Sequence, residues 1–214
     1  MDLASYIDHS ILQPNYTEKE LENQIAKCIE LKVYAVCVNP FWVKKAVELS
    51  EGKLVVCSVV SFPFGLDTKG QKVFQSLKAL EDGAKELDIV MNFSALKSGL
   101  IKYVEEELKA IGRSTEGFTR KVIIETAYLN DEEKRLAVEL IANAGMEFVK
   151  TSTGYAPKGA SEEDVKLLLE ASKGRLKVKA SGGIRSREQV TRFVELGASR
   201  IGTSATFEIL NRGG

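Results

Sequence analysis

Two hydrophobic periods alternate along the chain. Short runs rich in β-branched residues are each followed by a longer charged segment in which apolar residues recur at helical spacing. The short runs predict buried strands, and the longer segments predict amphipathic helices. The eight predicted strands cover residues 7–12, 34–39, 53–60, 86–92, 121–126, 147–152, 176–181 and 199–204.

The segments between these strands carry helix start and stop signals. Thr17 opens one segment and Glu20 follows three residues later, which is the capping-box pattern. Pro40 suits the first position of the next helix, and Gly83 and Gly145 suit positions just past two helix ends. The predicted helices cover residues 17–31, 39–49, 68–83, 95–112, 130–145, 161–174 and 186–197.

Strands that alternate with helices in this way are expected to pair in parallel, since each crossover has about 15–25 residues. A doubly wound sheet and a closed (β/α)8 barrel both satisfy the pattern. The count of eight strands favours the barrel, as does the absence of a GxGxxG sequence after the first strand. Since no linker or low-complexity tract divides the chain, residues 1–214 are predicted to form one α/β (TIM) barrel domain with an extra N-terminal helical segment.

Composition excludes several classes of function. Lys plus Arg and Asp plus Glu number 30 each, so neither a nucleic acid nor a membrane surface is an expected partner. No leader and no long apolar run is visible, and the three cysteines lack CxxC spacing, which together favour a cytoplasmic protein with reduced thiols. The single histidine, His9, makes a histidine-rich metal site impossible and a histidine-based triad improbable.

Polar residues near the carboxyl ends of the strands are the first candidates for chemistry, because barrel active sites lie there. Side chains in a strand alternate between its two faces. This alternation turns Asp88, Lys150 and Lys179 toward the barrel axis on three strands, and two of those strands are neighbours. A structural ion-pair network is the alternative interpretation, but convergence of the three residues favours a catalytic one.

Paired lysines with a carboxylate in a closed pocket suit imine chemistry on a carbonyl substrate. An amine is a nucleophile only when it is unprotonated, and a lysine amine ordinarily has a pKa of about 10.4. A second ammonium group and the loss of water both disfavour the charged form, so both activate the amine. A carboxylate within reach can then move protons, directly or through a water molecule.

Two glycine-containing segments follow the last two predicted strands, SGGIR at 181–185 and IGTSA at 201–205. In barrels, the loops after these strands often bind phosphate through backbone N–H groups. Glycine allows close approach of the backbone, a serine hydroxyl can donate a hydrogen bond, and arginine adds positive charge. One glycine pair alone would serve a simple turn. The candidate phosphate-binding residues are Gly154, Gly182, Gly183, Gly202, Ser204 and Arg185.

Five segments together resemble the deoxyribose-phosphate aldolase family, whose members are class I aldolases on a TIM barrel. The segments are IDHSIL, ELDIVMN, KVIIET, FVKTSTGY and VKASGGIR. The combination of VKTSTG with KASGGIR is highly specific. The resemblance extends over nearly the whole chain, from residue 6 to residue 210 or close to it.

The resemblance implies roles for individual residues. It places the Schiff-base lysine at Lys150, the lysine that perturbs it at Lys179, and the proton-relay aspartate at Asp88. It places phosphate-binding backbone at the glycines named above, together with Ser204. Two further residues are implied near the substrate: Ser10, where the family usually has threonine, and Cys37, for which a small buried hydrophobe is the alternative interpretation.

Two positions depart from the family pattern. Gln13 replaces a lysine that is usual in the opening motif, at a position we take to be peripheral. Ala205 follows Ser204 where the family often has a second serine, so one phosphate-facing hydroxyl is missing. We expect this change to affect phosphate affinity rather than imine chemistry.

The implied reaction is the reversible cleavage of 2-deoxy-D-ribose 5-phosphate to acetaldehyde and D-glyceraldehyde 3-phosphate, with no metal or organic cofactor. The resemblance also implies a homodimer or homotetramer, and the chain end ILNRGG (209–214) is too short to reach the active site. Two other functions stay open here. One is a different imine-forming sugar-phosphate aldolase, and the other is a catalytically inactive phosphate-binding barrel.

Overall fold

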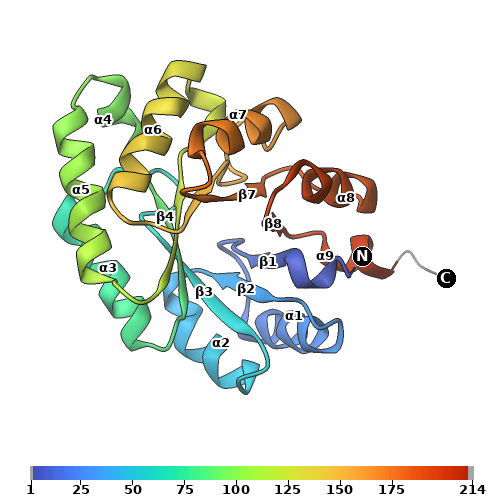
Figure 1. Ribbon diagram of the computed structural model, residues 1–214. Helices are drawn as coiled ribbons and strands as arrows, with labels where there is room; N and C mark the ends of the chain where they lie inside the picture. The colour runs from blue at the N-terminus through green and yellow to red at the C-terminus, as the bar shows by residue number, and fades with distance from the viewer. Residues whose placement is uncertain (1, 212–214) are drawn as a thin grey trace.

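Eight parallel strands close into a barrel in the computed structural model, which describes residues 2–211 (Figure 1). Each strand pairs with its neighbour in sequence, and β1 closes the barrel against β8 with Ile7 opposite Ile201. The predicted barrel is confirmed and the doubly wound sheet is wrong. The strands are β1 Ile7–Ile11, β2 Ala35–Val38, β3 Val55–Val60, β4 Glu86–Val90, β5 Thr119–Ile123, β6 Phe148–Lys150, β7 Lys177–Ser181 and β8 Arg200–Thr203.

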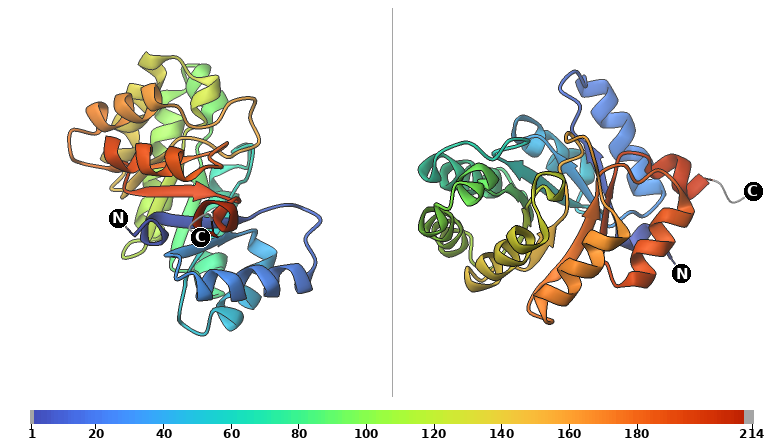
Figure 2. Two further views of the ribbon diagram at one scale, coloured as in Figure 1. Left: turned by 90° about the vertical axis from the view of Figure 1, so that its right-hand side faces the viewer. Right: turned by 90° about the horizontal axis from the view of Figure 1, so that it is seen from above.

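Helices form the outer layer around these strands (Figure 2). The capping box predicted at the start of α1 is formed, since the Thr17 hydroxyl accepts from the Glu20 N–H and the Glu20 carboxylate accepts from the Thr17 N–H. The helices are α1 Glu18–Glu30, α2 Val43–Ser50, α3 Lys69–Glu81, α4 Phe93–Lys97, α5 Ile101–Ser114, α6 Asp131–Asn143, α7 Glu162–Ser172, α8 Arg187–Leu196 and α9 Thr206–Asn211. Three 3-10 turns complete the order: η1 Ala4–Tyr6, η2 Pro40–Trp42 and η3 Thr126–Tyr128.

The structure differs from the sequence-based prediction in three elements. The predicted helix over 95–112 is two helices, because Gly99 adopts a φ of 72° and ends α4 before α5 begins. The extra N-terminal helical segment is the single turn η1, and α9 was not predicted. Residues 212–214 of the predicted tail lie outside the described residues. Within residues 2–211, no helix is long and apolar enough to cross a membrane.

The two faces of the barrel wall differ in polarity. On β4, Leu87 and Ile89 join the apolar core under the helices, while Asp88 faces the axis. Branched apolar side chains usually fill such an interior. Here buried charged residues from six strands occupy much of it: Asp8, Glu86, Asp88, Lys121, Lys150, Lys179 and Arg200. We call these seven residues the barrel network.

Candidate active site

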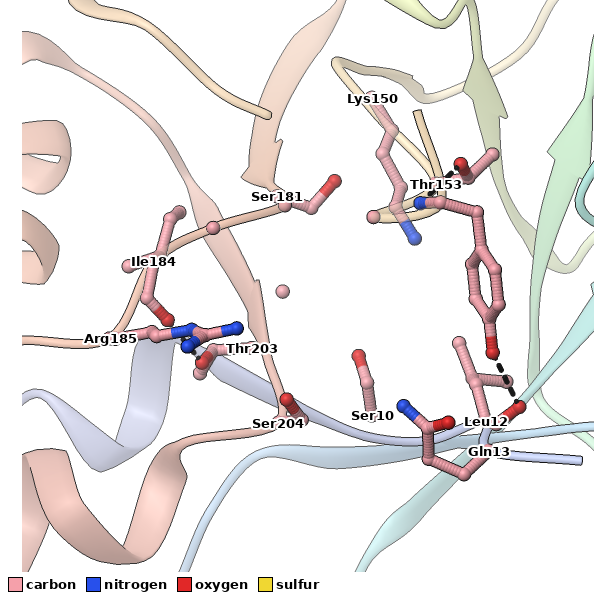
Figure 3. A pocket seen from close by; sticks show the side chains of 15 residues that line it. Ser10, Leu12, Gln13, Lys150, Thr153, Ser181, Ile184, Arg185, Thr203 and Ser204 are labelled. Atoms are coloured by element: carbon pink, nitrogen blue, oxygen red, sulfur yellow. Dashed lines mark hydrogen bonds between the residues drawn. The ribbon is translucent and has the colours of Figure 1, made fainter. Parts of the chain in front are cut away.

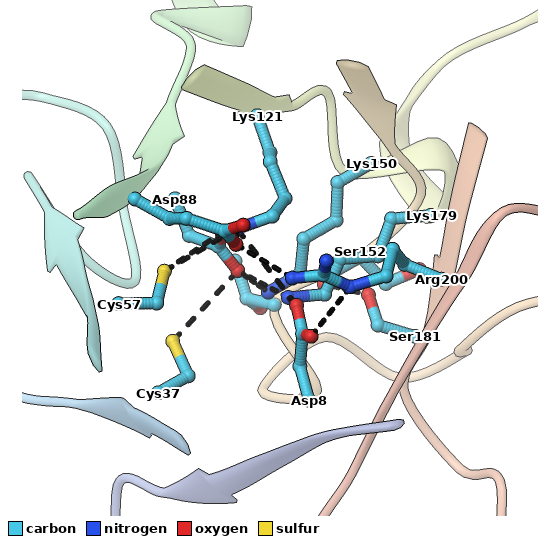
Figure 4. Close-up of polar contacts among 12 residues, drawn as sticks. Asp8, Cys37, Cys57, Asp88, Lys121, Lys150, Ser152, Lys179, Ser181 and Arg200 are labelled. Carbon is cyan, nitrogen blue, oxygen red and sulfur yellow. Dashed lines mark hydrogen bonds and ion pairs between the residues drawn. The ribbon is translucent and has the colours of Figure 1, made fainter. Parts of the chain in front are cut away.

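Asp88 lies at the centre of the barrel network and accepts hydrogen bonds from three lysines (Figure 4). Lys150 Nζ and Lys179 Nζ each donate to Asp88 Oδ2 at 2.7 Å. Lys121 Nζ donates to Asp88 Oδ1 at 2.9 Å. Lys150 and Lys179 are register partners on adjacent strands, which explains why their amines meet at one oxygen. The structure therefore brings together the three residues that alternation turned toward the axis.

A second layer of charges connects the network across the barrel. Asp8 accepts from Lys179 Nζ at 2.5 Å and from Arg200 Nε at 2.7 Å. Glu86 accepts from Arg200 Nη2 at 2.6 Å and pairs with Lys121 Nζ at the same distance. Lys121, Lys179 and Arg200 thus each bind two or more carboxylates.

Lys150 differs from the other cations of the network. Within residues 2–211 its amine pairs with one carboxylate only, that of Asp88. It is also the network residue that lines the cavity described below. A lysine with one ionic partner and access to a cavity can leave that partner to attack a substrate, whereas Lys121 and Lys179 are fully buried and held from two sides.

The charged groups of the barrel network set the protonation states of Asp88 and Lys179. Burial by itself would raise the pKa of Asp88, but Lys121, Lys150 and Lys179 outweigh it and hold that pKa well below its usual range. Burial by itself would lower the pKa of Lys179, but Asp8 and Asp88 outweigh it and raise that pKa above its usual range. Asp88 is therefore a carboxylate and Lys179 a fixed ammonium. Strand alternation identified Lys179 and Asp88 but not Asp8, which helps to keep Lys179 charged.

Two thiols reach Asp88 from β2 and β3. Cys57 Sγ donates to Oδ1 at 3.2 Å and Cys37 Sγ to Oδ2 at 3.8 Å. Cys37 is fully buried within the barrel and does not line the cavity, so its predicted contact with substrate is not seen. The thiols and Asp88 are spaced like cation ligands. The ammonium groups of Lys121 and Lys179 on the same carboxylate oppose a cation, and burial raises the pKa of the Cys57 thiol well above its usual range, so the set does not fit a metal.

A cavity of about 160 Å³ opens at the carboxyl ends of β6, β7, β8 and β1 (Figure 3). Within residues 2–211 the side chains of Ser10, Ser204 and Arg185 make no hydrogen bond to the protein, so their donors are free for a ligand. The hydroxyls of Ser181 and Thr203, in contrast, donate to carbonyl groups. The predicted substrate-site residues that line the cavity are Ser10, Gly154, Gly182, Gly183, Arg185, Gly202 and Ser204.

Glycine is required at two positions of this wall. Gly182 has a φ of 87°, and a Cβ there would lie 3.0 Å from the Gly159 Cα and 3.2 Å from the Ser152 Cβ. A Cβ on Gly202 would lie 2.9 Å from the Ser181 Cβ and 3.1 Å from Cε of Lys179. The wall of the cavity is therefore backbone at these points.

Sequence reasoning missed four members of the barrel network. Lys121 and Asp8 obey the same alternation rule that identified Asp88, and applying the rule to the first and fifth strands would have found them. Glu86 and Arg200 begin their strands, at the end opposite to the one searched. The remaining cavity residues, also missed as site residues, are Leu12, Gln13, Thr153, Tyr155, Ser181, Ile184 and Thr203. Gln13 is thus not peripheral.

Comparisons with known proteins agree in family and fold. A family model described as DeoC/LacD family aldolase matches residues 3–206. The deoxyribose-phosphate aldolase of Aquifex aeolicus (strain VF5) is 50% identical over 209 residues, covering 98% of this chain and 95% of that protein. The deoxyribose-phosphate aldolase of Thermococcus gammatolerans is 47% identical over 215 residues, covering 98% and 96%.

Two solved structures superpose over nearly the whole chain. A structure described as QR15, an aldolase, has a TM-score of 0.96 and 49% sequence identity, and the match covers 99% of this chain and 95% of that one. A tetrameric deoxyribose phosphate aldolase from Aeropyrum pernix has a TM-score of 0.90 and 34% identity, covering 98% and 89%.

Proposed function

The chain belongs to the DeoC/LacD family of aldolases, and from that premise we propose that it reversibly cleaves 2-deoxy-D-ribose 5-phosphate to D-glyceraldehyde 3-phosphate and acetaldehyde. One observation carries the proposal for the site. Lys150 is the network lysine with a single carboxylate partner, and it lines a cavity that is also lined by backbone glycines, Ser204 and Arg185.

We propose that Lys150 is the covalent nucleophile. Its uncharged amine attacks the C1 aldehyde, and loss of water leaves a protonated imine. The proton of the C3 hydroxyl leaves as the C3 carbonyl forms, and the C2–C3 bonding electrons move to C2, neutralising the imine as an enamine. Protonation of C2 and addition of water then release acetaldehyde and restore the amine.

Lys179 and Asp88 have supporting roles in this proposal. The Lys179 ammonium is the charge that neighbours the proposed nucleophile, since both amines bind the same oxygen of Asp88. Asp88 is too weak a base to hold a proton itself, since its pKa lies well below its usual range. It instead holds the amines in place and orients the water molecule that carries the proton.

Substrate phosphate is proposed to bind at the glycine wall. The backbone of Gly182, Gly183 and Gly202 bounds the cavity there, and Ser204 and Arg185 offer free donors. Lys150 and this wall border the same cavity, which suits a short sugar phosphate with an aldehyde at the far end from its phosphate.

Borohydride trapping tests the proposal. The protein is incubated with 2-deoxy-D-ribose 5-phosphate, reduced, digested and analysed by mass spectrometry. We expect one reduced adduct, on Lys150, and none in a Lys150→Ala variant. An adduct on Lys179 or Lys121 would contradict the assigned nucleophile. Trapping only with other sugar phosphates would indicate a different aldolase, and absence of any adduct would indicate a phosphate-binding barrel without imine chemistry.

We further propose a homodimer or homotetramer in a reducing, cytoplasmic environment. The Aeropyrum pernix relative is described as a tetramer. Large apolar side chains, including Phe41, Phe64 and Phe74, are exposed on this chain, and its three cysteines are free. Light scattering coupled to size-exclusion chromatography measures the assembly, and a monomeric mass would contradict it.

A further inference from the structure

The geometry points to Tyr155 as a residue that determines which aldehydes the cavity accepts, an inference that rests on the aldolase activity proposed above. Tyr155 lies in the loop between β6 and α7, and its ring lines the cavity. Its hydroxyl donates to the carbonyl of Leu12 at 3.0 Å. Leu12 follows β1, so one side chain connects two loops on either side of the opening.

Contacts on several sides hold this ring in place. It packs edge-on against Phe62, with ring centroids 5.4 Å apart and an interplanar angle of 88°. The Tyr155 N–H donates to the Thr153 hydroxyl at 3.0 Å, and that hydroxyl donates to the buried carboxylate of Glu125. The ring is therefore a fixed part of the cavity wall even though the residue is 48% exposed.

The Tyr155 ring lies across the cavity from the proposed phosphate-binding wall. Figure 3 shows Ile184 and Arg185 on one side of the cavity and Thr153 and Leu12 on the other. Tyr155 is bonded to both Thr153 and Leu12, so it belongs to this second side. One wall thus offers backbone, hydroxyl and guanidinium donors, and the facing wall offers an aromatic ring and a leucine.

This asymmetry restricts the shape of the substrate. A chain that runs from Lys150 to the glycine wall crosses the cavity that Tyr155 bounds on the other side. An unbranched aldehyde with small hydroxyl substituents fits between the two walls. An aldehyde carrying bulky branches next to its carbonyl meets the ring, and the bond to Leu12 prevents the ring from swinging away.

The experiment measures selectivity among acceptor aldehydes in the condensation direction, with acetaldehyde as donor. D-glyceraldehyde 3-phosphate is compared with 2,2-dimethylpropanal, which is branched next to its carbonyl. In Tyr155→Ala we expect the ratio of kcat/KM for the branched to the natural aldehyde to rise by about 10-fold or more, as for the removal of a pocket wall. Tyr155→Phe keeps the ring and loses the bond to Leu12, so its ratio should rise less.

Tyr128→Ala is the matched control. Tyr128 is similarly exposed, at 44%, and packs against Phe93, but it does not line this cavity. Its removal should leave the ratio at the wild-type value. An unchanged ratio in active Tyr155→Ala, or an equal rise in Tyr128→Ala, overturns the inference. A wild-type protein that catalyses no condensation would instead overturn the proposed function, and this inference with it.

Discussion

Within residues 2–211, lysine and carboxylate side chains that are both buried contact each other in two places, and only one of these places suits catalysis. Outside the barrel wall, Lys72 on α3 pairs with Glu107 on α5 at 2.8 Å and donates to the Val90 carbonyl at 2.9 Å. We call Lys72 and Glu107 the helix pair. Both side chains are fully buried and neither borders the active-site cavity. In the barrel network, three lysines share one aspartate, and Lys150 reaches the cavity.

The pKa shifts in the two places run in opposite directions. Burial lowers the pKa of Lys72, and Glu107 only partly offsets it; burial likewise raises the pKa of Glu107. In the network, attraction from several opposite charges prevails over burial, so the pKa of Lys179 is raised and that of Asp8 is lowered to about 2. Lys72, whose pKa is lowered, thus has no access to the cavity. A lowered pKa does not identify a nucleophile without access to substrate.

The strongest test of this contrast replaces one lysine from each place with methionine, which keeps most of the length and removes the charge. We expect Lys150→Met to lower kcat by at least about 10³-fold, because the proposed mechanism has no other covalent amine. Lys72→Met should retain turnover close to the wild-type value. Steady-state kinetics on 2-deoxy-D-ribose 5-phosphate measure both.

The free energy of unfolding provides a second comparison between Lys72→Met and Lys150→Met. Lys72→Met leaves Glu107 buried without its partner, so the free energy of unfolding should fall by about 3–5 kcal/mol in urea titrations. If folded Lys72→Met lost as much activity as Lys150→Met, access to the cavity would not distinguish the two lysines. The contrast between the barrel network and the helix pair would then be wrong.

A smaller effect is expected from Lys179→Leu. The raised pKa of Lys179 means that this group stays positively charged at every pH at which the enzyme works. Its removal eliminates the positive charge that shares Asp88 Oδ2 with the Lys150 amine. We expect kcat to fall about 10²-fold and the pH optimum to move upward. Lys179→Arg keeps the charge, so its optimum should stay near that of wild type; an unchanged or lower optimum in Lys179→Leu would contradict the argument.

These contrasts also show which parts of the molecule sequence alone can predict. The strands were found because residues such as Val36 and Val122 are buried in short β-branched runs. The break at Gly99 was missed because a helical pattern continues on both sides of it, and a single glycine in such a pattern is tolerated.

For the site, alternation within a strand identified which face each side chain takes, and so it found Asp88, Lys150 and Lys179. Alternation within one strand does not show which side chains of distant strands form ion pairs with it. The Lys179 amine bonds to Asp8, which is 171 positions away, and that contact helps decide whether the lysine is charged. The Tyr155 bond to Leu12 likewise follows from how two loops meet above the barrel.

The smallest predicted effect concerns acid stability, where Asp8 and Glu107 should behave oppositely. The folded-state pKa of Asp8, about 2, is below its ordinary value of 3.8, so the unfolded chain binds more protons in that range. The stabilisation from Asp8 is therefore complete above about pH 4 and is lost as the pH falls toward 2; it is on the order of 2 kcal/mol. The pKa of Glu107 is raised above 4.5, so its ionisation destabilises the native state at neutral pH, and acidification relieves that cost.

Urea unfolding of wild type, Asp8→Asn and Glu107→Gln between pH 7 and pH 3 separates these two contributions. As the pH falls from 7 toward 4.5, wild type should gain stability relative to Glu107→Gln, because the raised pKa of Glu107 makes the native state take up this proton first. Over the same range its difference from Asp8→Asn should stay constant, and it should shrink only below about pH 4. Parallel curves for the two variants would show that both carboxylates are in the same electrostatic situation, and the distinction between the barrel network and the helix pair would not hold.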